Sequence, residues 1–214
     1  MQHIKKILAA GIFLVSLFTI SFVLQGSLKA DNFSEKPRLD KPVYVESGVM
    51  LKVIWREDVY DPSLKGTVNV IKLDESYFSG ITEPERAVLG YLASTIGNEC
   101  YAETGKQNVK CKILTALNLG YQCSEENKTF LKNWFRDDAT IVSQIENCKP
   151  TLPSTVEKTF DEVKISTADN TIKVELKGLK LNIKENSASK WSETMSFKVD
   201  GDKLTLIERT KKQK

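Results

Sequence analysis

The chain has 214 residues, with 31 Lys and Arg against 28 Asp and Glu, a formal net charge of +3 and one histidine. That histidine is His3, and Lys5, Lys6 and Lys29 carry the excess charge, so the chain beyond residue 30 is neutral and lacks histidine. A neutral body offers no basic footprint for nucleic acid. The missing imidazole excludes Ser-His-Asp triads, Cys-His pairs and His-ligated metal sites. We expect no cofactor, no metal and no nucleic-acid partner.

Residues 1–30 have the layout of a secretory signal peptide. Two lysines precede residues 7–28, which carry no charge, and Ala30 offers a small residue for cleavage. Residues 7–28 also have about the 20 residues that a transmembrane helix needs, so an uncleaved membrane anchor is the alternative. Either form places the remainder outside the cytoplasm. We expect a secreted or periplasmic protein, in contact with a membrane only if this segment is uncleaved.

Residues 31–42 are polar and contain two prolines, as a flexible leader does. Residues 43–81 then show the pattern of strands. Apolar and polar residues alternate around Trp55 and again around Val70, and the turn residues DPSLKG lie between the two runs. We therefore expect N-terminal strands within residues 43–81.

Residues 82–149 have the apolar spacing of a helical lobe. Thr82 and Glu85 form a capping box with Pro84 in the first turn, and an apolar stripe follows up to Gly97. Later stripes predict three more short helices: near residues 109–119, after a cap at Ser124, and near residues 139–147.

Four cysteines lie in this lobe: Cys100, Cys111, Cys123 and Cys148. An even number in an exported chain predicts disulfides, and the absence of a C-x-x-C spacing argues against a redox or zinc site. The second predicted helix separates Cys111 from Cys123 too far for a bond that needs α-carbons within about 7 Å. We expect Cys100–Cys111 and Cys123–Cys148 disulfides, each stabilising the fold by about 3 kcal/mol.

Residues 150–210 change to the period of two that antiparallel strands require, which predicts a β-meander with one dry and one wet face. The phase slips after Leu176. Either a bulge at Gly178, which we favour, or a hairpin turn at Lys177-Gly178 would return Leu179 and Leu181 to the dry face. One strand carries its apolar series at Trp191, Glu193, Met195, Phe197 and Val199.

The wet face of the predicted meander is rich in lysine. Its members are Lys164, Lys173, Lys177, Lys180, Lys184, Lys190 and Lys198. A polyanion could bind such a face, but Glu175, Glu185 and Glu193 lie among the lysines. We therefore interpret it as a solvated face that is protected against edge pairing. Residues 211–214 are interpreted as a short basic tail.

Together these elements predict an α+β fold. It joins a C-terminal antiparallel β-meander sheet, extended by N-terminal strands, to a disulfide-stabilised bundle of about four short helices. Two functions fit this chain. The first is a non-catalytic binding protein whose partner is another protein or an envelope component. The alternative is a polysaccharide or peptidoglycan hydrolase, because that chemistry needs two carboxylates and no histidine. Glu99 and Glu103 are then the candidate catalytic residues. The lack of any specific catalytic motif favours the binding protein.

Overall fold

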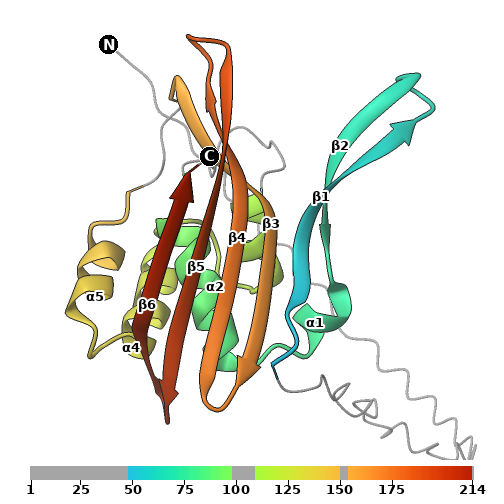
Figure 1. Ribbon diagram of the computed structural model, residues 1–214. Coiled ribbons are helices and arrows are strands. Elements are labelled where there is room, and N and C mark those ends of the chain that lie inside the picture. The colour runs from blue at the N-terminus through green and yellow to red at the C-terminus, as the bar shows by residue number, and fades with distance from the viewer. Residues whose placement is uncertain (1–47, 98–108, 150–153, 214) are drawn as a thin grey trace, which may run out of the picture. The chain divides into compact units, whose positions relative to one another are not determined.

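A computed structural model describes residues 48–97, 109–149 and 154–213, all of which belong to the unit Lys41–Lys214. The predicted signal peptide and leader lie outside these residues, as do Glu99, Cys100 and Glu103. The described chain forms an α+β fold built on a six-stranded sheet (Figure 1).

All neighbouring strands of the sheet are antiparallel, in the order β2-β1-β3-β4-β5-β6. The strands are β1 (Leu51–Asp61), β2 (Gly66–Leu73), β3 (Val156–Ala168), β4 (Thr171–Asn182), β5 (Ser187–Asp200) and β6 (Lys203–Gln213). The predicted meander is therefore confirmed as β3 to β6, and the N-terminal strands extend the same sheet. Since β6 continues to Gln213, residues 211–213 are part of the sheet and not a free tail.

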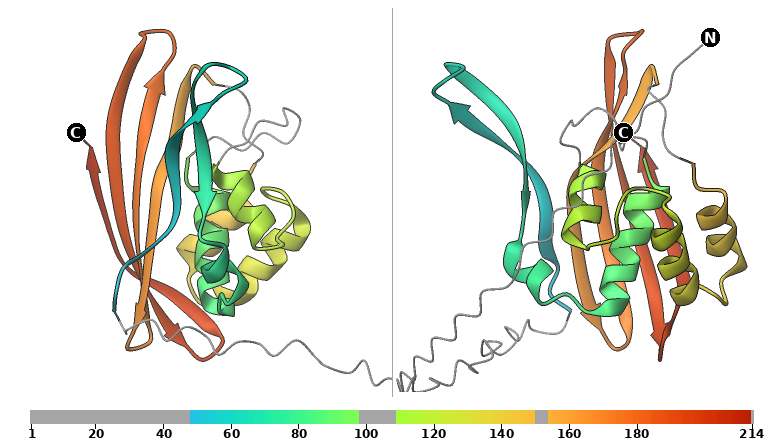
Figure 2. Two further views of the ribbon diagram at one scale, coloured as in Figure 1. Left: turned by 90° about the vertical axis from the view of Figure 1, so that its right-hand side faces the viewer. Right: turned by 180° about the vertical axis from the view of Figure 1, so that it is seen from behind.

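Helices cover one face of the sheet (Figure 2). They are α1 (Glu75–Ser79), α2 (Glu83–Thr95), α3 (Val109–Ala116), α4 (Glu125–Trp134) and α5 (Ala139–Glu146). The capping box of Thr82 and Glu85 begins α2, and the Ser124 hydroxyl caps α4, as predicted. The sequence pattern missed α1, which begins where the Asp74 side chain accepts the backbone N–H of Tyr77.

The core lies between the helices and this face of the sheet. Tyr91 of α2, Phe135 after α4 and Phe197 of β5 are fully buried, and their ring centroids are 5.3 to 6.0 Å apart. Aromatic rings at these separations attract one another beyond the gain from burying their area. The alternating apolar residues of β4 and β5 supply the sheet side of this core.

Neither explanation of the phase slip at Gly178 is correct. β4 runs through Gly178 without a turn, and the register shift lies in the neighbouring strand β3, between Phe160 and Glu162. Asp161 is therefore the extra residue of a bulge in β3. Because β4 keeps its alternation, Leu179 and Leu181 lie half-buried on the face that the helices leave open, not in the core.

The open face carries ion pairs between lysines and glutamates, as expected for a solvated surface. Lys177 lies 2.8 Å and Lys164 3.6 Å from Glu162, and Lys173 lies 3.7 Å from Glu175. Four assignments to this face were wrong. Lys184 and Glu185 lie in the turn between β4 and β5. Lys180 alternates with Leu179 and so projects from the other face, and Glu193 is buried among the core residues of β5.

The first hairpin leaves the sheet. β1 pairs with β3 only from Leu51 to Trp55, whereas its pairing with β2 continues to Asp61. Beyond the last contact with β3 the hairpin turns away from the other strands (Figure 1). We call residues 57–70, which form this projecting part of the hairpin, the arm.

Candidate functional site

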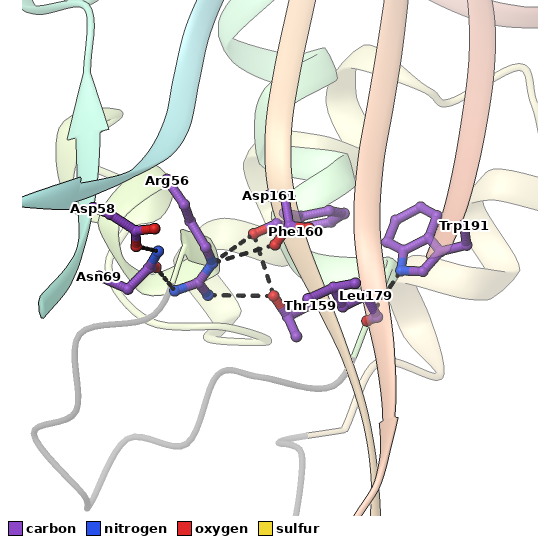
Figure 3. Close-up of polar contacts among 8 residues, drawn as sticks. All are labelled: Arg56, Asp58, Asn69, Thr159, Phe160, Asp161, Leu179 and Trp191. Carbon is purple, nitrogen blue, oxygen red and sulfur yellow. Dashed lines mark hydrogen bonds and ion pairs between the residues drawn. The ribbon is translucent and has the colours of Figure 1, made fainter. Parts of the chain in front are cut away.

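An arginine holds the arm at its root, where β1 and β3 diverge. The Arg56 guanidinium donates hydrogen bonds to the Phe160 carbonyl (3.0 Å), to the Thr159 hydroxyl (3.2 Å) and to the Asn69 side-chain carbonyl (3.3 Å) (Figure 3). The Asn69 amide in turn donates to Asp58 at 2.8 Å. One side chain thereby links β3 to both strands of the hairpin at the point where the sheet divides.

The bulge in β3 brings a carboxylate to the same place. Asp161 is the extra residue of that bulge, and its Oδ1 lies 3.6 Å from Arg56 Nε. Burial raises the pKa of Asp161, and the positive charges of Arg56 and Lys190 only partly oppose this shift. Asp161 therefore forms an ion pair with Arg56, beside the hydrogen bonds of the guanidinium to Thr159 and Phe160.

Close packing beside this junction requires a glycine in β4. Gly178 lies opposite Trp191, and an added Cβ would come within 1.8 Å of the Thr159 carbonyl oxygen and 2.7 Å of the Trp191 ring. The indole N–H of Trp191 donates to the Leu179 carbonyl at 3.2 Å (Figure 3). Lys158 Nζ lies 4.0 Å from the centroid of the same indole, a cation–π contact. Burial lowers the pKa of Lys158, and Glu193 opposes that shift.

A second cluster lies on the helix-facing side of the sheet. Glu193 is 2% exposed; Arg209 Nε donates to its Oε1, and Lys211 Nζ lies 4.0 Å from the same oxygen. Its Oε2 has no hydrogen-bond partner in the described part of the chain. Nearby, Tyr91 donates to the side-chain carbonyl of Gln144 at 2.7 Å, and burial raises the pKa of Tyr91. A buried carboxylate whose negative charge is stabilised by a guanidinium is a poor general acid, so we interpret this cluster as structural.

The predicted Cys123–Cys148 disulfide is confirmed, with α-carbons 5.5 Å apart. It joins the start of α4 to the end of α5, as the antiparallel arrangement of these helices requires. Buried polar groups surround it. The Gln122 amide donates to the Ser94 carbonyl, and the Asn127 amide donates to the Ser94 hydroxyl, both at 2.8 Å. Cys123 is nearly buried, so the bond fixes helices and does not serve as an exposed redox centre.

The other predicted site residues stay untested. Glu99, Glu103 and Cys100 lie outside the described residues, so the proposed pair of catalytic carboxylates and the Cys100–Cys111 bond remain predictions. Cys111 is itself disulfide-bonded. The sequence alone did not identify the Arg56 junction or the buried Glu193, although Glu193 does fall within an apolar series of β5.

An open groove of about 530 Å³ lies on the outer side of the helices. Its lining residues are Arg86, Leu119, Glu125, Glu126, Thr129, Phe130 and Asn133. Arg86 crosses the groove, with its guanidinium carbon 4.5 Å from the Phe130 centroid and its Nε donating to the Leu117 carbonyl. These contacts engage the Arg86 guanidinium within the chain.

No cluster of three or more His, Cys, Asp or Glu residues suited to a metal ion occurs within residues 48–97, 109–149 and 154–213. None of the helices in these ranges has the length and apolar character needed to span a bilayer. Comparison of the chain with protein-family models, with curated proteins and with solved structures finds no match.

Proposed function

We propose that this chain is an exported, non-catalytic binding protein that contacts another protein or an envelope component through the arm. One observation carries the proposal: no side chain from Trp55 to Val70 is buried, although this segment forms a regular hairpin. The arm therefore contributes nothing to the hydrophobic core. A two-stranded ribbon is marginally stable by itself, and the hydrogen bonds of Arg56 compensate for this at the root.

The end of the arm presents apolar side chains to solvent. Tyr60 is 63% exposed and Leu64, in the turn, is 68% exposed. Single exposed apolar residues are common on protein surfaces. Here the two lie close together on a segment that projects from the fold and has no role in its core. An aromatic and an aliphatic side chain at such a position suit the centre of a protein contact.

The disulfide supports the exported location, because such bonds persist in oxidising compartments and are rare in the cytoplasm. The alternative hydrolase depends on Glu99 and Glu103, and no feature of the described residues favours it. We therefore retain one function, partner binding, and use the hydrolase to define an outcome that would overturn it.

The test compares three forms of the exported chain in affinity capture from an envelope extract under non-reducing conditions. They are the wild type, a Tyr60→Ser/Leu64→Ser double variant and an Ile183→Ser control. Ile183 is 62% exposed and lies outside the arm, so it is a matched apolar surface position. The captured partner is then purified and titrated against each form.

We expect the arm variant to bind the partner at least tenfold more weakly, which corresponds to about 1.4 kcal/mol, with the control unchanged. Equal binding by all three forms would show that the arm is not the contact surface. Cleavage of peptidoglycan by the wild type, abolished by Glu99→Gln, would replace the proposal with the hydrolase.

A further inference from the structure

The two outer edges of the sheet differ in charge. The outer strands are β2 and β6. The only charged residue of β2 is Lys72. By contrast, β6 carries five charged residues: Lys203, Glu208, Arg209, Lys211 and Lys212. The remaining residues of β2 are glycine, threonine, valine, asparagine, isoleucine and leucine. Charged side chains normally protect an edge strand from pairing with another chain, and β2 lacks that protection.

The direction of the backbone groups of β2 follows from two hydrogen bonds. The Asp74 N–H donates to the Val53 carbonyl of β1 at 3.0 Å. Backbone groups of a strand change side at each residue, so the even-numbered residues of β2 face β1 and the odd-numbered residues face outward. Consistently, the outward carbonyl of Ile71 accepts a hydrogen bond from Lys112 of α3.

The Lys112 ammonium therefore occupies the outer edge of β2 at Ile71. A short segment of this edge, between Ile71 and the turn of the hairpin, lies beyond it. The backbone N–H and C=O groups of Thr67 and Asn69 point outward and have no partner within the described residues. These two residues lie symmetrically on either side of Val68. A strand that paired there in the antiparallel sense around Val68 would satisfy all of these groups.

We propose that β2 pairs with β2 of a second copy of this chain, antiparallel, around a two-fold axis at Val68. In this register Thr67 of each copy faces Asn69 of the other, and each such pair exchanges two hydrogen bonds. The two-stranded arm then becomes part of a four-stranded sheet, and a sheet of three or more strands is the minimum for independent stability.

The side chains are self-complementary in this register. On one face Val68 lies opposite Val68 of the second copy, and Val59 of β1 lies beside each of them. The half-buried valines thereby form one apolar row across the four strands. On the other face Thr67 meets Asn69, both uncharged, so no like charges oppose one another.

The junction is short, and two such edges bury less than the roughly 800 Å² per partner that is typical of stable complexes. The dimer should therefore dissociate on dilution. The proposal does not rest on the partner-binding function, because Tyr60 and Leu64 lie outside the paired segment. A negative result for dimerisation would therefore leave the partner-binding proposal standing, and a negative result for partner binding would leave the dimer proposal standing.

The test is sedimentation velocity of the exported chain over a range of concentrations. Val68→Lys places two ammonium groups opposite each other at the two-fold axis, and Val68→Glu places two carboxylates there. Val68 is only half-buried, so both variants should fold. The control is Thr205→Lys, which adds the same charge at an exposed position of the other edge, β6.

We expect the wild type and the control to dimerise with increasing concentration, and each Val68 variant alone to stay monomeric at the same concentrations. An equimolar mixture of the two Val68 variants should dimerise again, because lysine then faces glutamate. A monomeric wild type at all concentrations would overturn the proposal. So would dimerisation of Val68→Lys alone to the wild-type extent, or a mixture that stays monomeric.

Discussion

Replacement of Gly178 by alanine tests whether the junction between β3, β4 and β5 is as tightly packed as described. The new Cβ would lie 1.8 Å from the Thr159 carbonyl oxygen and 2.7 Å from the Trp191 ring. Overpacking typically costs about 1–3 kcal/mol, and we expect the upper end because one of the two contacts is with backbone. Alanine loses less backbone conformational freedom on folding than glycine does, which offsets this cost by about 0.5–1 kcal/mol. The net loss in the free energy of unfolding is therefore about 2 kcal/mol.

The assay is urea denaturation with the disulfides intact, supported by thermal melts, in which this loss corresponds to a fall in Tm of about 4–8 °C. The NMR shift of the Trp191 indole N–H gives a local measure of the same change. Gly80→Ala is the control, because its nearest atom is 3.8 Å away and its φ is −109°; we expect it to change stability by less than about 0.5 kcal/mol. If Gly178→Ala were as mild as this control, the packing argument would be refuted.

Three further predictions concern the arm, the disulfide and the open face. Arg56→Met should accelerate amide exchange across the arm about tenfold, since about 1.5 kcal/mol of charged hydrogen bonding is lost; unchanged exchange would show that Arg56 does not hold the arm. Cys123→Ala with Cys148→Ala should lower the free energy of unfolding in urea by about 3.5 kcal/mol, for a loop with a sequence separation of 25, and undiminished stability would contradict this. Burial acts to raise the pKa of Glu162, but its hydrogen bond to Lys177 and the nearby positive charges outweigh that effect, so the pKa is lowered. The stabilisation from ionised Glu162 is therefore present above its unfolded pKa and lost as the pH falls through the folded pKa. Glu162→Gln should flatten the pH dependence of stability between about pH 5 and pH 3, and an unaltered slope would count against the pairing.

The sequence predicts the meander well because its strands bury one face each. In β5 every second residue from Trp191 to Phe197 is buried, including Glu193. However, the alternation of apolar and polar residues within one strand reveals irregularities in that strand only. The slip after Leu176 was assigned to Gly178, while the extra residue is Asp161 in the adjacent strand. A bulge in a neighbour leaves no mark on the alternation of β4, so the sequence of β4 cannot place it.

The candidate site was less predictable, for a related reason. Arg56 bonds to Phe160, 104 residues further along the chain, and no local pattern indicates a contact of that range. The helix α1 has only five residues, too few to show a helical period. Glu193 stands in the apolar series of its strand but was also counted among the surface glutamates. The Arg209 guanidinium on the next strand, which donates a hydrogen bond to Glu193, accounts for its burial.

The pairing of β1 with β3 has a consequence for how the chain folds. Hairpin contacts within β3 to β6 close short loops, whereas the contact between Arg56 and Phe160 closes a loop of 104 residues. Long loops cost more entropy to close and slow the formation of the contacts that they connect. We therefore expect the C-terminal meander to form early and the first hairpin to dock last. The surface that β1 covers on β3 would then be exposed in the late folding intermediate, and that intermediate would be the species most prone to aggregation.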